Sequence, residues 1–230
     1  MSDPAEIIKL LARFTGPDLT RTLSGIEGTV RGVTADQCNA FLEKAGAGRE
    51  VLSAAAEMKR LASQINVTIH ALGILLCLPH ILEPGEEVQC VSLGAGNTGR
   101  VFDLETNYRV AEFKFIRWRG GAESIRQNGI FKDYLMLAEY ETDKRKYLYL
   151  LGLEHALKFF KGGRAIPSVL SRDSTVSELF TDRYGDQFRT VKDYFAVHGD
   201  AVHIEDVSPW LSELAGDLIA DVSSENLLSE

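Results

Sequence analysis

Phe102-Asp103-Leu104 and Val110-Ala111-Glu112-Phe113-Lys114-Phe115 carry three charged residues inside otherwise apolar stretches. The second stretch alternates apolar and charged side chains with the two-residue period of a β-strand. Glu112 and Lys114 are therefore expected on one face of this strand, and its apolar residues on the other. An acid and a base that share one face of so apolar a strand indicate a functional site.

Asp103 adds a second carboxylate to this pattern. If it lies on a neighbouring strand beside Glu112, the two carboxylates repel each other unless a hard divalent cation lies between them. The spacing therefore predicts a Mg²⁺ site with the amine of Lys114 next to it. The alternative is a surface salt bridge between Glu112 and Lys114, but the apolar residues around the pair favour a central strand.

The composition favours some classes of protein and excludes others. A chain of 230 residues with 45% hydrophobic residues can form one core, or a core with a helical appendage. A net charge of −8 argues against a protein that coats nucleic acid by bulk attraction, so phosphate contacts must come from a local basic patch. Cys38, Cys77 and Cys90 have unrelated spacings, which favours reduced thiols over disulfides or a zinc site, and hence a cytoplasmic protein.

Membrane association is not expected. The amino terminus has no basic patch followed by an apolar stretch, so no secretory signal is predicted. The apolar run Ile65 to Leu82 is short for a bilayer and contains Asn66, Thr68, His70, Pro79 and His80. We interpret this run as a buried core helix.

Three segments are predicted along the chain. Residues 1–48 form a helical amino-terminal extension, with breaks at Gly16-Pro17 and around residues 46–48 and with Thr34 as N-cap of a helix over 35–44. Residues 49–165 form the core. Residues 166–230 form a mainly helical, acidic extension that packs on the core, with a final helix starting at Ser208-Pro209.

The core segment predicts an α/β (α+β) fold with a mixed central sheet flanked by helices. Apolar positions from Glu50 to Cys77 recur at helical spacing until Pro79 stops the helix. Strands are expected over 88–93, 100–105 and 108–116, the last two forming a hairpin. An amphipathic helix from Ala122 and a strand over 146–151 complete the order helix, strand, strand, strand, helix, strand.

These residues, in this order of elements, resemble the PD-(D/E)XK nuclease superfamily of restriction endonucleases and RecB-like nucleases. The resemblance covers roughly residues 50–152 and implies a restriction endonuclease-like core. It also implies that Asp103 and Glu112 bind Mg²⁺, that Phe113 offers its backbone oxygen to the metal, and that Lys114 orients and helps deprotonate the attacking water. Mn²⁺ can substitute for Mg²⁺ in such sites.

The implied chemistry is physically consistent. Phosphodiester hydrolysis needs a cation that neutralises the charge on the phosphate and lowers the pKa of the attacking water. A lysine suits the handling of that water because burial and a nearby metal lower its pKa toward neutrality.

Further candidates lie on the flanking helices. Gln127 shares a helical face with apolar residues such as Phe131, and RecB-like nucleases carry a catalytic Gln on the corresponding helix, although followed by Tyr where this chain has Phe131. The alternative is a polar residue near the helix start. Glu57, with Glu50 behind it, is the candidate for a further metal-binding acid, and a solvated helix face is the alternative.

Several histidines are further candidates for metal ligands. His70 and His80 could join a RecB-like metal shell, but lone histidines in an apolar run are more often core residues. His198, His203, Glu205 and Asp206 fit no known metal cage, so a loop is expected there.

A basic cluster brackets the predicted site and is expected to bind nucleic acid, with the tryptophan stacking on an unpaired base and the cations holding phosphates. A solvated edge is the alternative. The residues are Arg117, Trp118, Arg119, Arg126 and Lys132.

Gly94-Ala95-Gly96-Asn97-Thr98-Gly99 matches the glycine pattern of Rossmann dinucleotide-binding proteins, with Glu112 near the place of the ribose-binding acid. That pattern requires a helix starting inside it, whereas strand alternation follows here. An NAD(P)-dependent oxidoreductase is therefore the weakest alternative.

The sequence predicts a Mg²⁺-dependent nuclease that hydrolyses phosphodiester bonds, with DNA expected ahead of RNA and defence, restriction or repair as settings that the resemblance suggests. A catalytically inactive module of the same fold, binding nucleic acid or protein, is the main alternative. A homodimer is compatible with both. Sequence specificity and endo- or exonuclease mode stay open.

Overall fold

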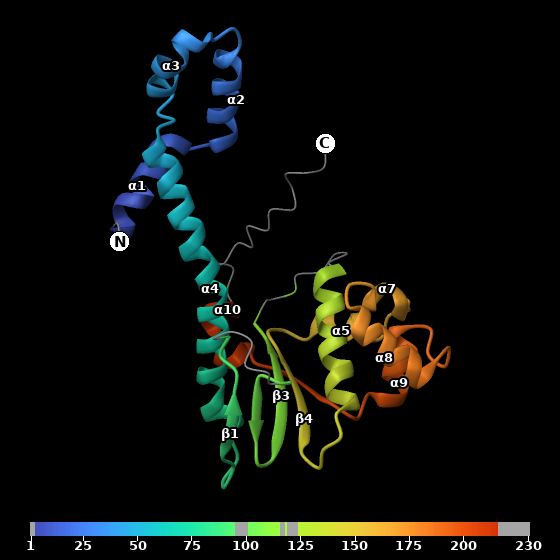
Figure 1. Cartoon of the computed structure of the whole chain (residues 1–230). Helices are drawn as coiled ribbons and strands as arrows, with labels where there is room; N and C mark the ends of the chain where they lie inside the picture. Colours follow the sequence, from blue (N-terminus) through green and yellow to red (C-terminus); the bar gives the residue numbers. More distant parts are fainter. Residues whose placement is uncertain (1–2, 95–100, 116–117, 119–123, 216–230) are drawn as a thin grey trace. The chain divides into compact units, whose positions relative to one another are not determined.

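The computed structural model describes residues 3–94, 101–115, 118 and 124–215 (Figure 1). The chain divides into two compact units, residues 1–66 and 67–230. The predicted boundary at residue 48 falls at the start of helix α4 (Arg49–Ile81), whereas the two units separate within that helix. Each unit is described by itself below.

The first unit is helical. It comprises α1 (Pro4–Thr15), α2 (Leu19–Val30), the 3₁₀ helix η1 (Ala35–Gln37), α3 (Cys38–Lys44) and the first half of α4. Asp3 and Asp18 cap α1 and α2 by accepting hydrogen bonds from backbone N–H groups. Thr34 forms a capping box with Gln37. The predicted short helices and their breaks at Gly16-Pro17 and residues 46–48 are therefore confirmed.

The second unit contains a five-stranded mixed sheet in the order β1-β2-β3-β4-β5. The strands are β1 (Val88–Val91), β2 (Leu104–Thr106), β3 (Arg109–Lys114), β4 (Arg145–Leu150) and β5 (His203–Asp206). The β1/β2 and β2/β3 pairs are antiparallel, and β3/β4 and β4/β5 are parallel. Helix α5 (Ser124–Glu139) connects β3 to β4. The order α4, β1, β2, β3, α5, β4 agrees with the prediction.

Each face of the sheet builds its own apolar core. Ala111 and Phe113 of β3, and Phe115 directly after it, pack with Ile74 and Cys77 of α4 on one face. Val110 of β3, with residues of β4, packs against α5 on the other. The alternation predicted for β3 is thus confirmed. Gly73 in α4 makes room for the sheet, because a Cβ there would lie 2.7 Å from the ring of Phe115.

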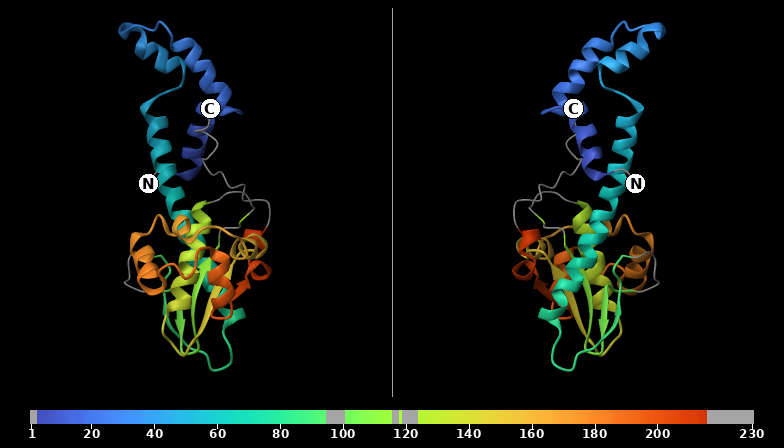
Figure 2. Two further views of the ribbon diagram at one scale, coloured as in Figure 1. Left: turned by 90° about the vertical axis from the view of Figure 1, so that its right-hand side faces the viewer. Right: turned by 90° about the vertical axis from the view of Figure 1, so that its left-hand side faces the viewer.

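Short helices complete the α5 side of the sheet. They are α6 (Glu154–Phe160), α7 (Ile166–Leu170), α8 (Ser174–Tyr184) and α9 (Val191–His198). Figure 1 and the turned views in Figure 2 show α7 to α9 in orange beside α5. Their buried side chains join the same core as those of α5, within one compact unit, so a separate extension from residue 166 stays a prediction.

Three local expectations are wrong. His203, Glu205 and Asp206 lie in strand β5, not in a loop, because they pair in parallel with β4. Pro79 does not end α4, which continues to Ile81 since the buried residues Cys77 and Ile81 hold its last turn on the sheet. The helix expected from Ser208 is represented by η2 (Ser208–Trp210) and α10 (Ser212–Ala215), and residues 216–219 lie outside the described residues.

Helix α4 is also more exposed than predicted. Ile74, Cys77 and Ile81 are buried, but Leu72, Leu75 and Leu76 face solvent. The second half of the helix is apolar all round, so its sequence did not reveal which face is covered. By length and composition α4 could cross a membrane, and one such helix is weak evidence for insertion. Cytoplasmic location stays a prediction.

The glycine-rich stretch does not develop into a nucleotide-binding helix within the described residues. Gly94 follows β1, and residues 95–100, including the expected helix start at Asn97, lie outside the described part of the chain. Val101 to Asp103 are not helical, and β2 begins at Leu104. A helix that binds a pyrophosphate through its amino terminus therefore has no room beyond residue 100.

Candidate functional site

The β2/β3 hairpin brings the two predicted carboxylates together. Leu104 pairs with Ala111 in the antiparallel register, so Asp103, one residue earlier, stands opposite Glu112, one residue later. The backbone N–H of Phe113 donates to Oδ2 of Asp103 at 3.0 Å. A side-chain hydrogen bond also joins Asp103 and Glu112. Two carboxyl groups that share a hydrogen bond must share one proton or one cation.

The pKa of Glu112 shows that Asp103 and Glu112 strongly oppose being ionised at the same time. Burial and the neighbouring carboxylates of Asp103 and Asp133 raise the pKa of Glu112 to about 9, although Lys114 opposes the shift. Without a cation, Glu112 therefore stays protonated at neutral pH.

Asp103 remains the ionised member of the pair. Burial opposes its ionisation, but hydrogen bonds from His70 and from the backbone of Phe113 lower its pKa below the ordinary value. Nε2 of His70, on α4, lies 3.2 Å from Oδ1 of Asp103. His70 is thus neither an isolated core histidine nor joined to a metal cage, but holds Asp103 in place.

Lys114 completes the group from the end of β3. Its Nζ lies 3.8 Å from Oε2 of Glu112 and 2.7 Å from Oδ2 of Asp133, which projects from α5. Burial lowers the pKa of Lys114, but Asp133 and Glu112 outweigh it and raise that pKa above the ordinary value. The expected shift of this amine toward neutrality is therefore wrong for the protein without metal, because the sequence did not reveal Asp133 as its partner.

Asp133 is the residue that sequence reasoning missed. It shares a helical face with Ile130 and Leu137, three residues before and four residues after it, and both are buried. The sequence did contain a signal for Asp133, because an acidic residue on an otherwise apolar helical face indicates a buried charged partner.

The donor set fits Mg²⁺ better than a transition metal. Within the described ranges, no group of three or more His, Cys, Asp or Glu side chains is arranged to hold a metal ion, which argues against a zinc cage there. Mg²⁺ is commonly bound through one or two carboxylates while it keeps several waters. Asp103 and Glu112 offer that number of hard oxygen ligands, and a cation between them would offset the repulsion that keeps Glu112 protonated. The role of the Phe113 carbonyl stays a prediction.

The other predicted metal and catalytic residues are not joined to this group. Glu57 belongs to the first unit, where Arg60 lies 3.8 Å from its carboxylate. Gln127 has a buried amide oxygen without a hydrogen-bond partner among the described residues, and no described contact links it to Lys114. His80 stacks on Trp210 with ring centroids 5.2 Å apart.

The predicted nucleic-acid-binding residues divide into three sets. Arg117 and Arg119 lie outside the described residues. Trp118 and Arg126 line a cavity of 210 Å³ together with Lys114. Lys132 instead forms an ion pair of 2.5 Å with Asp173, the N-cap residue of α8, which gives it a structural role.

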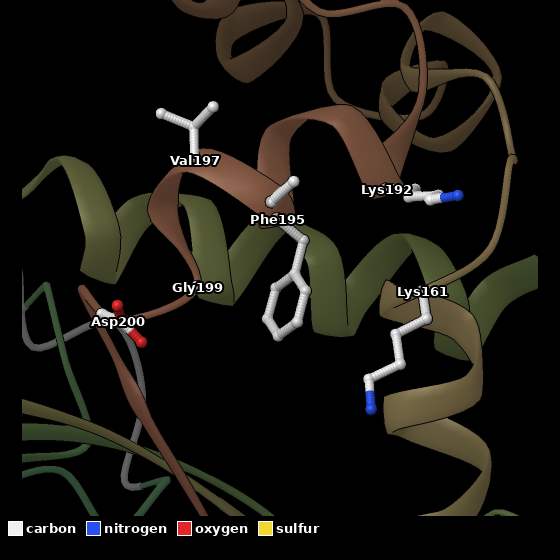
Figure 3. Close-up of a pocket in the computed structure, with 7 residues that line it drawn as sticks. Lys161, Lys192, Phe195, Val197, Gly199 and Asp200 are labelled. Carbon is white, nitrogen blue, oxygen red and sulfur yellow. The ribbon is translucent and has the colours of Figure 1, made fainter.

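A second cavity, of 390 Å³, lies at the surface beside α9 (Figure 3). Lys161 and Lys192 line it, but Figure 3 shows their ammonium groups pointing in different directions, with the ring of Phe195 to one side of both. Asp200 lies away from both amines. No convergent set of polar groups forms there, so the carboxylate pair is the stronger candidate site.

Comparison with known proteins adds no assignment. No family model matches the chain, and neither the curated proteins nor the solved structures contain a match. The proposed function therefore rests on the geometry of the site and on the resemblance of its motif.

Replacing Glu112 with Gln is expected to stabilise the protein at pH 8. Between the ordinary pKa of 4.5 and about 9, the folded state binds one more proton at Glu112 than the unfolded state, so stability falls as pH rises through that window. Without divalent cations, the variant should gain about 2 kcal/mol or more at pH 8 and nothing at pH 4. Urea unfolding at both pH values measures this, and a loss of stability at pH 8 would contradict the repulsion.

Proposed function

We propose that the chain is a Mg²⁺-dependent nuclease of PD-(D/E)XK type, acting on phosphodiester bonds and on DNA in preference to RNA. The observation that carries the proposal is the convergence of Asp103, Glu112 and Lys114 at one end of β2 and β3. A restriction endonuclease-like core is supported by the order α4, β1, β2, β3, α5, β4. The preference for DNA rests on the resemblance of the motif.

Asp103 and Glu112 would hold the metal ion, which supplies a Lewis acid that lowers the pKa of its water and neutralises charge on the phosphate. His70 and the Phe113 N–H fix the orientation of Asp103. As a ligand, Glu112 would be ionised, its proton being released to solvent when the cation binds.

Lys114 acts as an ammonium group beside the reacting phosphate. Asp133 fixes the position of the ammonium group. Lys114 can therefore donate hydrogen bonds to the attacking water and to a phosphate oxygen without first having to reorient. The half-exposed side chain of Lys114 keeps its amine within reach of a substrate.

The experiment is a cleavage assay on plasmid and single-stranded DNA with Mg²⁺, Mn²⁺ or EDTA, alongside calorimetric titration of Mg²⁺. Cleavage should require the metal, and Asp103→Asn should lose both metal binding and cleavage. Asp173→Asn is the matched control, because its carboxylate also accepts a backbone N–H, that of Val176, but lies outside the site. Metal binding by Asp103→Asn equal to that of the unmodified chain would refute the assignment.

An inactive module of the same fold is the second candidate. The observation in its favour is the ion pair of Lys114 with Asp133, which occupies the amine in the absence of metal. It predicts nucleic-acid or protein binding without cleavage under any metal.

A further inference from the structure

The cavity beside Lys114 is lined mainly by apolar residues, which phosphodiester hydrolysis itself does not require. Its walls come from the carboxyl ends of β3 and β4, from α5 and from α6. In open α/β sheets, ligands bind outside the carboxyl ends of parallel strands. The apolar walls include Ile130, Leu150, Leu151 and Ala156, which are buried.

The cavity is small, and two of its lining residues are basic. Its 210 Å³ is below the roughly 300–1,000 Å³ typical of drug-sized ligands, so it suits one flat ring system. The basic residues are Lys114 and Arg126. A mainly apolar cavity with cations in its lining matches a base attached to a phosphate-bearing backbone.

Trp118 argues for a nucleobase rather than a purely apolar ligand. Its ring lies against Phe159, with centroids 5.9 Å apart, and it also lines the cavity. Its indole N–H is buried and has no acceptor among the described residues. Because indole nitrogen is only a donor, a ligand with acceptor atoms would satisfy it. Nucleobases carry such acceptors on their edges.

We infer that this cavity receives one unpaired base of the substrate strand, in contact with Trp118, while the adjoining phosphate lies at Lys114. A base that is still paired cannot enter a slot between α5 and α6 of this size. The substrate class is therefore single-stranded nucleic acid or a frayed strand end. This inference rests on the proposed function for the phosphate at Lys114, but the base site itself can be tested separately.

Gly129 provides a substitution that fills the cavity without replacing any of the proposed reacting groups Asp103, Glu112 and Lys114. It lies within α5 and lines the cavity, and a Cβ at this position would meet no atom within 4 Å. Leucine and alanine are both better helix formers than glycine, so both variants should fold. Gly129→Leu extends into the cavity, and Gly129→Ala is the matched control that leaves most of it open.

Tryptophan fluorescence reports on the base directly. The chain has two tryptophans, so Trp210→Phe leaves Trp118 as the reporter, and phenylalanine can keep the stacking on His80. The single-stranded probe is a ten-nucleotide oligothymidylate, the duplex control is a long G·C-rich hairpin whose ends do not fray, and Ca²⁺ replaces Mg²⁺. The single strand should quench the fluorescence and the duplex should not. Gly129→Leu should weaken binding about tenfold or more relative to Gly129→Ala, as expected for loss of one stacked base.

Equal quenching by single strand and duplex, or equal affinities of the two Gly129 variants, would overturn the inference. If Mg²⁺-dependent cleavage persists while these differences are absent, the base site fails and the nuclease stands. If the single strand binds as expected and no metal supports cleavage, the nuclease fails and the base site stands.

Discussion

Replacing Lys114 with methionine is expected to lower the rate of Mg²⁺-dependent phosphodiester cleavage by about 10²–10³-fold, the cost of removing one well-placed donor from a transition state. Methionine keeps most of the length of the lysine stem but lacks the ammonium that Asp133 holds at 2.7 Å. The affinity for Mg²⁺ should not fall, because the two carboxylate ligands remain.

Lys144→Met is the matched control for this substitution. Lys144 also forms an ion pair at the sheet, 2.6 Å from Glu105, but lies outside the candidate site. Its loss should leave cleavage unchanged. Initial rates under saturating Mg²⁺ and calorimetric metal titration separate the two effects, and a Lys114→Met protein that cleaves at the normal rate would refute the role assigned to this residue.

Arg109→Met is expected to destabilise the second unit by about 3–5 kcal/mol, because it leaves the buried carboxylate of Glu86 without its partner. Arg109 binds Glu86 through two nitrogens, Nε and Nη2, each 2.6 Å from a carboxylate oxygen. Both side chains are almost fully buried. Arg109 also donates to the hydroxyl of Tyr149 at 2.8 Å, and Thr106 donates to Glu86 at 2.6 Å.

Urea unfolding followed by circular dichroism measures this loss. The double variant Arg109→Met/Glu86→Leu is the control, since removing both charges together should recover part of the stability. A double variant no more stable than Arg109→Met would show that the lost packing, not the orphaned charge, causes the effect.

Low pH should reduce the stability of the protein through the same Arg109–Glu86 pair. Burial opposes ionisation of Glu86, but hydrogen bonds from Arg109 and Thr106 outweigh it and lower the pKa of Glu86 below its ordinary value of 4.5. Its contribution to stability is therefore complete above the unfolded-state pKa and is lost as pH falls toward the folded-state pKa. The double variant should lose less stability than the unmodified chain below about pH 4.5.

Local patterns explain the parts of the fold that the sequence predicted well. Alternation in residues 110–115 predicted which side chains of this stretch share a face, and Thr34 was predicted as a helix N-cap. Asp3 and Asp18 also cap helices, but these two caps were not predicted. Such features depend on neighbours a few residues apart, so they can be read from the chain itself.

The candidate site was predictable in part for the same reason. Asp103 and Glu112 are joined by a hairpin of a few residues, so their meeting across the register follows from two adjacent strands and the turn between them. His70 contacts Asp103 across 33 positions of sequence, and Asp133 reaches Lys114 from a separate helix. Neither contact leaves a periodic signal.

The sequence by itself therefore determined the alternation of β3, the order of the core elements and the pairing of two carboxylates. Only the tertiary structure gave Lys114 its partner Asp133, placed β5 beside β4, and left one apolar side of α4 exposed. The physical reason is that strand and helix periodicity is set by short-range geometry, whereas the charge on a buried amine and the covered face of a helix depend on which distant surfaces pack together.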